Sequence, residues 1–336
     1  MAKIVLGMVS SHGPLLVTPP ELWTGRIEAD RRNPALFYRG KTYGFDALVE
    51  ARANENLEPE LALDVRERRF DACQKAIAEM RRVYAQVKPD VTIMIGNDQM
   101  EIMGEENQPT FMVYHGEHMD NVPFTDEQKK LLGPGVALAE PNHHPEVTKT
   151  YPACPELALH LIDELMGRGF DLATSNELPE RRQSRLTGLP HAFGYYYQRI
   201  MESPAPMVPV FINTFYPPNQ PRLARCHALG VAIAEAVESW DKDLRVAILG
   251  SGGMTHFVVD EPFDRRFLAA FQQEDSTDLF ALPEIQFNSG NSELKNWLPV
   301  RAAMQHAGLP FTLLDYQPLY RSMAGTGSGM GFGVWK

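Results

Sequence analysis

Residues 244–256 read LRVAILGSGGMTH, and this stretch decides the class of fold. Its first part is apolar apart from Arg245, as in a strand that is buried on both faces of a sheet. The glycine-rich and polar part that follows marks the end of that strand. Three more stretches of the same form occur at residues 3–9, 91–95 and 208–212. Four such strands predict a central sheet covered on both faces.

Helical patterns lie between these strands. Apolar side chains recur at helical spacing in four stretches, which are 64–88, 155–166, 221–240 and 292–298. Ser292 is the expected N-cap of the last one. Strands that alternate with helices predict an α/β fold, with a central mostly parallel or mixed sheet in a single three-layer α/β/α domain over residues 1–336.

The segments outside this pattern have their own predicted forms. The pattern of residues from about 20 to 88 predicts an N-terminal helical segment. The Pro- and Asn-rich residues from about 104 to 155 and from about 176 to 190 predict long loops, with a short strand at 110–114. The glycine-rich residues 325–333 lack a following helix, and they predict a loop that packs closely on the body of the domain.

Composition excludes several classes of protein. The 336 residues include 32 Lys and Arg against 43 Asp and Glu, which gives a formal net charge of -11. Such a chain repels phosphate backbones, so we expect no nucleic-acid partner. No apolar run approaches the roughly 18 residues of a membrane helix, so we expect no membrane partner and a cytoplasmic location. The three cysteines form neither a disulfide framework nor a paired metal motif.

Polar residues follow each of the four predicted strands. They are Ser10-Ser11-His12, Asn97-Asp98-Gln99, Asn213 with Tyr216, and Gly250 to His256. Ligands of open α/β sheets bind at the carboxyl ends of the strands. If the four strands are parallel neighbours, these residues converge on one crevice, where Asn213 and Tyr216 are candidates to bind a substrate.

Other histidines favour ordinary roles. His143 and His144 stand beside Pro145 in a predicted loop, and adjacent residues seldom point at one metal, so we place them on the surface. His160 and His227 lie inside helical patterns and are expected to be structural.

The order of these elements resembles that of a known family. Ser10-Ser11-His12, Asn97-Asp98, Tyr216-Pro217-Pro218, the 250–256 stretch and Glu293-Leu294 occur together in this order. The chain therefore resembles the class III extradiol ring-cleavage dioxygenases, of which the catalytic beta subunit of protocatechuate 4,5-dioxygenase is the type. Gallate and 3-O-methylgallate dioxygenases belong to the same group. The resemblance marks the N-terminal helical segment at about 20–88 as an addition to the family's type subunit.

The resemblance implies a mononuclear non-haem Fe(II) held by two histidines and a glutamate. His12 matches the first histidine ligand, and Glu293 matches the glutamate. His256 matches the histidine that transfers protons, and His191 falls where a second non-ligand histidine near the substrate is expected. Gln99 stands where the family has its second iron histidine.

Three interpretations of Gln99 remain open. Gln99 itself, or Glu101 two residues further on, can supply the missing ligand. His115 or His118, after the predicted strand at 110–114, can replace it. Otherwise the chain holds no catalytic iron and is a silent homologue or a binding subunit. An active enzyme is favoured, because a silent subunit has little reason to keep a proton-transfer histidine.

The resemblance predicts an Fe(II)-dependent dioxygenase that inserts O2 into a small aromatic substrate. The expected substrate is a carboxylated or methoxylated catechol such as protocatechuate, gallate or 3-O-methylgallate, and a homodimer is implied. The alternatives are the silent homologue and a metal-dependent hydrolase, since His and Glu also suit Zn²⁺.

Overall fold

The computed structural model describes residues 1–132, 136–178 and 188–336. The strands in this part of the chain are β1 (Lys3–Ser10), β2 (Leu36–Tyr38), β3 (Lys41–Tyr43), β4 (Val91–Gly96), β5 (Phe111–Tyr114), β6 (His118–Asn121), β7 (Lys149–Pro152), β8 (Ala173–Ser175), β9 (Met207–Ile212), β10 (Arg245–Ser251), β11 (His256–Val258), β12 (Phe311–Tyr320) and β13 (Thr326–Trp335). The α-helices are α1 (Ile27–Arg32), α2 (Phe45–Ala51), α3 (Leu63–Val87), α4 (Asp126–Leu131), α5 (Pro155–Gly167), α6 (His191–Arg199), α7 (Leu223–Ser239), α8 (Glu261–Phe271), α9 (Thr277–Phe280) and α10 (Trp297–His306).

One mixed sheet organises the molecule. Its strand order is β11-β13-β1-β10-β4-β9-β5-β8. The ninth strand, β12, lies outside this order and pairs with β13. The four strands expected from the sequence are parallel neighbours, since β10 lies between β1 and β4, and β9 follows β4. β13 runs antiparallel to β1, and β5 runs antiparallel to β9. The predicted α/β class with a mixed sheet is confirmed.

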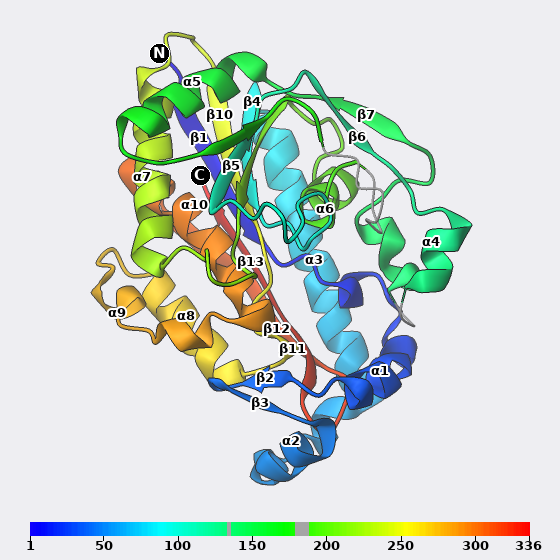
Figure 1. Cartoon of the computed structure of the whole chain (residues 1–336). Coiled ribbons are helices and arrows are strands. Elements are labelled where there is room, and N and C mark those ends of the chain that lie inside the picture. The colour runs from blue at the N-terminus through cyan, green and yellow to red at the C-terminus, as the bar shows by residue number, and fades with distance from the viewer. Residues whose placement is uncertain (133–135, 179–187) are drawn as a thin grey trace.

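Helices cover both faces of this sheet. Along β10, Val246 and Ile248 enter one apolar core, and Ala247 and Leu249 enter the other. This alternation follows from the period of two along a strand. Figure 1 shows α7 and α10 on one side of the sheet and α3 on the other. Within the described residues, no helix is both long enough and apolar enough to cross a membrane.

The glycine-rich C-terminal stretch is a strand, so the predicted loop is wrong. β13 pairs with β1, β11 and β12 and is buried throughout. Its glycines allow neighbours to approach closely: a Cβ on Gly331 would lie 2.8 Å from the Trp297 ring, and one on Gly329 would lie 2.9 Å from Cβ of Met254. Glycine-rich sequence usually suggests a loop, but in β13 the missing side chains make room for neighbouring residues to pack against the strand on both faces of the sheet.

Three other expectations need correction. The predicted strand at 110–114 is present as β5, but the residues from 104 to 155 also contain the two-stranded β6–β7 sheet and α4, because polar and Pro-rich sequence also forms short surface elements. The N-terminal segment includes the β2–β3 hairpin besides its helices. Residues Ser289–Asn296 form a 3₁₀ helix that precedes α10, so Ser292 lies inside a helix and does not cap one. Of the predicted loop at 176–190, residues 179–187 lie outside the described residues.

Candidate active site

A cavity of about 1210 Å³ opens at the carboxyl ends of the parallel strands. Most of the predicted site residues contribute to its walls, although they come from distant parts of the sequence. The polar residues that line it include His12, Gln99, Glu101, His191, His256 and Glu293. The sequence-based expectation that the strand ends meet in one crevice is confirmed by this arrangement.

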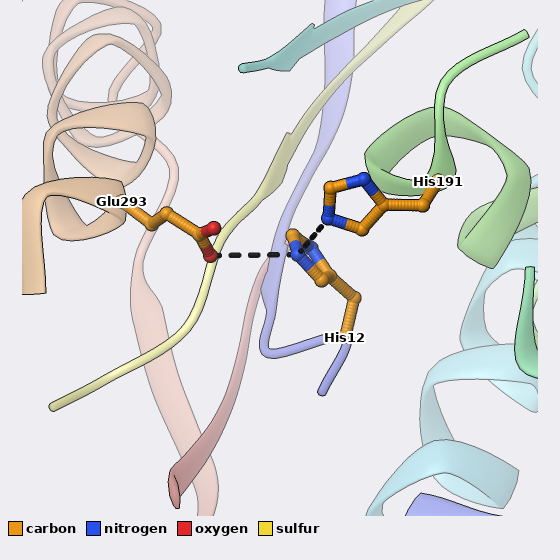
Figure 2. A group of neighbouring side chains, drawn as sticks. All are labelled: His12, His191 and Glu293. Carbon is orange, nitrogen blue, oxygen red and sulfur yellow. Dashed lines mark hydrogen bonds and ion pairs between the residues drawn. The ribbon is translucent and has the colours of Figure 1, made fainter. Parts of the chain in front are cut away.

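Three of these residues form a group that can hold a metal ion. His12 follows β1, His191 begins α6, and Glu293 lies in the 3₁₀ helix Ser289–Asn296. One nitrogen or oxygen atom from each lies within 4.8 Å of the others. Nε2 of His12 is 3.1 Å from Nε2 of His191 and 3.4 Å from Oε2 of Glu293. Figure 2 shows the three side chains converging from separate elements.

The tautomer of His12 follows from its hydrogen bonds. The Ser251 hydroxyl donates to the carbonyl oxygen of Ala192 at 2.6 Å, so its oxygen is left to accept from Nδ1 of His12 at 2.8 Å. Nε2 therefore keeps its lone pair, which faces the group. Burial lowers the pKa of His12 to about 4, so the ring is neutral and able to act as a ligand.

Glu101 fixes the orientation of His191. Its carboxylate accepts the backbone N–H of His191 at 2.8 Å and also accepts from Nδ1 of the ring. Burial favours a neutral His191, but the Glu101 charge and hydrogen bond outweigh it and raise the pKa of His191 to about 9. A carboxylate behind an imidazole is the usual support of a metal-binding histidine, because it leaves Nε2 facing the ion.

Glu293 is held as a carboxylate by several donors. Gln99 donates from Nε2 to Oε1 at 2.6 Å, and the backbone N–H of Gly253 donates to Oε2 at 2.7 Å. Burial opposes ionisation of Glu293, but its interactions with the rings of His12, His256 and His191 outweigh burial and hold its pKa well below the usual range. Gln99 thus lies at the group with its amide nitrogen toward the glutamate.

His256 lies on the other side of Glu293. Nδ1 of His256 donates to the carbonyl oxygen of Met254 at 2.8 Å, and Nε2 is 3.6 Å from Oε1 of Glu293. Burial disfavours the protonated ring, but the Glu293 carboxylate outweighs it and raises the pKa of His256 above its ordinary value. Nε2 of this ring is thus the atom free to exchange a proton inside the cavity.

Some predicted candidates lie elsewhere. His118 is exposed in β6, His115 follows β5, and neither belongs to the residues that line the cavity. Asn213 and Tyr216 hold a turn through reciprocal hydrogen bonds of 2.8 and 2.9 Å. Tyr216 also reaches the cavity wall, whereas Asn213 does not.

The sequence interpretation of His143 and His144 as surface residues is wrong. Their side chains are 9% and 3% exposed, and both line the cavity. Nδ1 of His143 donates to the backbone carbonyl of His191 at 3.2 Å, and Nδ1 of His144 donates to Oδ1 of Asn121 at 2.9 Å. A turn after the 3₁₀ helix Ala137–Asn142 brings them inward. A pair of histidines beside a proline carries no local signal of this burial.

Comparison with curated proteins finds ring-cleaving dioxygenases. The chain is 29% identical over 185 residues to a 2,3-dihydroxyphenylpropionate/2,3-dihydroxicinnamic acid 1,2-dioxygenase of Comamonas testosteroni, covering 55% of this chain and 49% of that protein. It is 32% identical over 109 residues to a gallate dioxygenase of Pseudomonas putida, covering 31% of this chain and 29% of that protein. The matched part thus spans about half the length of the curated relatives, or less.

The family model of the catalytic LigB subunit of aromatic ring-opening dioxygenase matches residues 59–326. This stretch covers most of the chain and includes Gln99, Glu101, His191, His256 and Glu293. The resemblance inferred from the strand-end residues is confirmed. The chain belongs to the LigB family of aromatic ring-opening dioxygenases.

Proposed function

We propose that the protein is an Fe(II)-dependent dioxygenase that opens the ring of a small catechol. The observation that carries this proposal is the group formed by His12, His191 and Glu293 in a chain of the LigB family. Relatives of the same family are named for gallate and for 2,3-dihydroxyphenylpropionate. The substrate proposed for this chain is therefore an aromatic ring with adjacent hydroxyl groups, together with O2.

The residues present fit the metal. Two imidazole nitrogens and one carboxylate are the facial ligand set of non-haem Fe(II) oxygenases. His12 is already neutral, whereas Fe(II) would have to displace the Nε2 proton that the raised pKa of His191 leaves on its ring. Ser251 and Glu101 hold the outer nitrogens of the two histidines, so both Nε2 atoms face Glu293. These residues would hold Fe(II), which would supply open coordination positions for a catechol and O2.

In this proposal His191 takes the place of the family's second iron histidine. Gln99 occupies that position in the sequence, but its amide nitrogen donates to Glu293. Its role is to position the glutamate and to keep it ionised. Glu101, two residues further, holds His191 in place. This arrangement supports the second interpretation of Gln99, in which a histidine from another segment replaces the missing ligand, but the histidine is His191 and not His115 or His118.

His256 is the proposed proton-transfer residue. Because Nδ1 is bound to the Met254 carbonyl, Nε2 is the atom that accepts a proton from a catechol hydroxyl and later returns it. Positioned proton transfer of this kind contributes about 10²- to 10⁴-fold to a rate. The same ring lies 3.6 Å from Glu293, next to the proposed ligand group.

Alanine variants of His191 and His256 separate the two roles. Bound iron and oxygen uptake are measured after anaerobic Fe(II) loading, with protocatechuate, gallate and 3-O-methylgallate offered in turn. His191→Ala is expected to lose bound iron. His256→Ala is expected to keep iron and to lose about 10²- to 10⁴-fold in oxygen uptake. His306→Ala, at a partly exposed histidine paired with Glu238, is the control that keeps both.

Two results would reject this proposal. Retention of iron in His191→Ala with its loss in His256→Ala would exchange the assigned roles. Wild-type protein that retains no iron and consumes no oxygen with any of the three substrates would leave the silent homologue as the interpretation.

A further inference from the structure

Two neighbouring side chains connect the backbones of the two proposed metal-binding histidines. Asn142 is the last residue of the 3₁₀ helix Ala137–Asn142, and His143 follows it. Asn142 donates from Nδ2 to the backbone carbonyl of His12 at 2.9 Å. His143 donates from Nδ1 to the backbone carbonyl of His191 at 3.2 Å. One short stretch of chain therefore holds both the segment after β1 and the start of α6.

This stretch is itself held by other elements. Oδ1 of Asn142 accepts from Arg199, the last residue of α6, at 2.9 Å. The same guanidinium donates to Gln74 of α3 at 2.6 Å. Asn121 of β6 donates to the backbone carbonyl of His143 at 2.9 Å. Asn142 and His143 thus occupy fixed positions relative to three separate elements.

The stretch also packs closely against α6 and the proposed metal group. A Cβ on Gly194 would overlap the backbone carbonyl of His143, so the two segments are in direct backbone contact. The ring of His143 meets the rings of His191 and His12 edge-on, with centroid distances of 5.4 and 6.1 Å. Asn142 is fully buried and His143 nearly so, which keeps water from competing for their hydrogen bonds.

A connection of this kind is needed because ring orientation alone does not set the separation of the two histidines. His12 and His191 are 179 positions apart in the chain. Ser251 and Glu101 hold the outer nitrogens of their rings. The 3.1 Å between the two Nε2 atoms also depends on where the two backbones lie. Ligand atoms of a functional site have to be held to within about 0.5 Å, and hydrogen bonds to both backbones supply that constraint.

We infer that Asn142 and His143 are positioning residues, which set the separation of His12 and His191 around the metal. This inference rests on the proposed function, since it takes these two histidines as metal ligands. Among the described residues, the group that can hold a metal consists of His12, His191 and Glu293 and does not include His143. His143 therefore acts through its Nδ1 donor. An asparagine, whose amide nitrogen lies in a similar place, can replace that donor, whereas a leucine cannot.

Metal binding without turnover tests this inference. Anaerobic titration with Co²⁺, a spectroscopic substitute for Fe(II), against a chromophoric chelator gives the affinity, and the visible absorption of bound Co²⁺ reports its coordination. Asn142→Leu and His143→Leu are each expected to weaken binding about 10- to 100-fold, the range for loss of a residue that supports a metal ligand, and to change the absorption. His143→Asn should keep most of the wild-type affinity. The matched control is His160→Leu, which removes a histidine that donates to the Ala236 carbonyl at 2.8 Å away from the cavity, and it should leave both readouts unchanged.

Each outcome separates this inference from the proposed function. Wild-type affinity in both Asn142→Leu and His143→Leu would overturn the inference, while the proposed metal site would stand. Equal losses in His143→Asn and His143→Leu would overturn it as well, because the imidazole itself would then be required. An equal loss in His160→Leu would show that the effect is not specific to the site and would also overturn it. Wild-type protein that binds no Co²⁺ would reject the inference and the proposed function together.

Discussion

Asp264 makes the stability of the fold depend on pH in a direction opposite to that of most carboxylates. Its side chain is fully buried behind Thr255, the residue before His256. It accepts the backbone N–H of Thr255 at 2.9 Å, and the hydroxyls of Thr255 and Tyr316 both lie 2.7 Å from Oδ2. Burial outweighs these hydrogen bonds and raises the pKa of Asp264 to about 7.

The sign of the effect follows from proton binding. The unfolded chain has a pKa near 3.8 for this residue, so between that value and about 7 the native state binds the extra proton. The contribution of Asp264 to stability is therefore present at acidic pH and is lost as the pH rises toward 7. Between about pH 5 and about pH 8 the expected loss is about 3 kcal/mol.

The variant Asp264→Asn isolates the pH-dependent contribution of Asp264 to stability, because an amide resembles the protonated acid and does not titrate. Urea unfolding of both proteins at several pH values gives the difference in their free energies of unfolding. The free energy of unfolding of the wild type minus that of the variant is expected to fall by about 3 kcal/mol from about pH 5 to about pH 8. Titration of buried histidines such as His144 cancels in this difference. A difference that is constant with pH, or that rises, would refute the reasoning.

Three further perturbations test the supports of the site. Ser251→Ala removes the group that holds Nδ1 of His12, so metal affinity measured against a chromophoric chelator should fall about 10- to 100-fold, and an unchanged affinity would contradict the tautomer argument. Arg321→Met leaves the Asp30 carboxylate buried without its bidentate partner, so the free energy of unfolding in urea should fall by about 3 to 5 kcal/mol. A loss below about 1 kcal/mol would mean that water replaces the guanidinium. Gly252→Ala places a Cβ against the backbone carbonyl of Glu293, so bound iron should be lost, and full retention would show that the 3₁₀ helix can shift.

The parts of the fold that were predictable have a local signal. The four central strands and helices α3, α5 and α7 follow from apolar runs and helical spacing, and their observed limits differ by a few residues at most. β13 carries no such signal, because its glycines take their meaning from Trp297 and Met254 in other elements. Its assignment as a loop failed for that reason.

The site shows the same division. His12 and His256 stand at strand ends that the sequence locates, whereas Glu293 was singled out through family resemblance. The contact between Glu101 and His191 joins residues that are 90 positions apart, and no spacing rule reveals it. His143 is buried by a contact with the backbone of His191, again across distant segments. Side-chain partners of this kind are properties of the folded chain.

The loop after β4 explains how a site of this family can lack a histidine at residue 99. The Asp98 carboxylate accepts the backbone N–H groups of Glu101, Ile102 and Met103, with distances of 3.0 to 3.1 Å, and so fixes the loop. Gln99 and Glu101 then both line the cavity. The first donates to Glu293 and the second holds His191, so a single short loop positions two proposed metal ligands from distant elements. The loop thus supplies no metal-binding histidine at residue 99, but its side chains orient Glu293 and His191. For this reason glutamine at residue 99 is compatible with the proposed group of His12, His191 and Glu293.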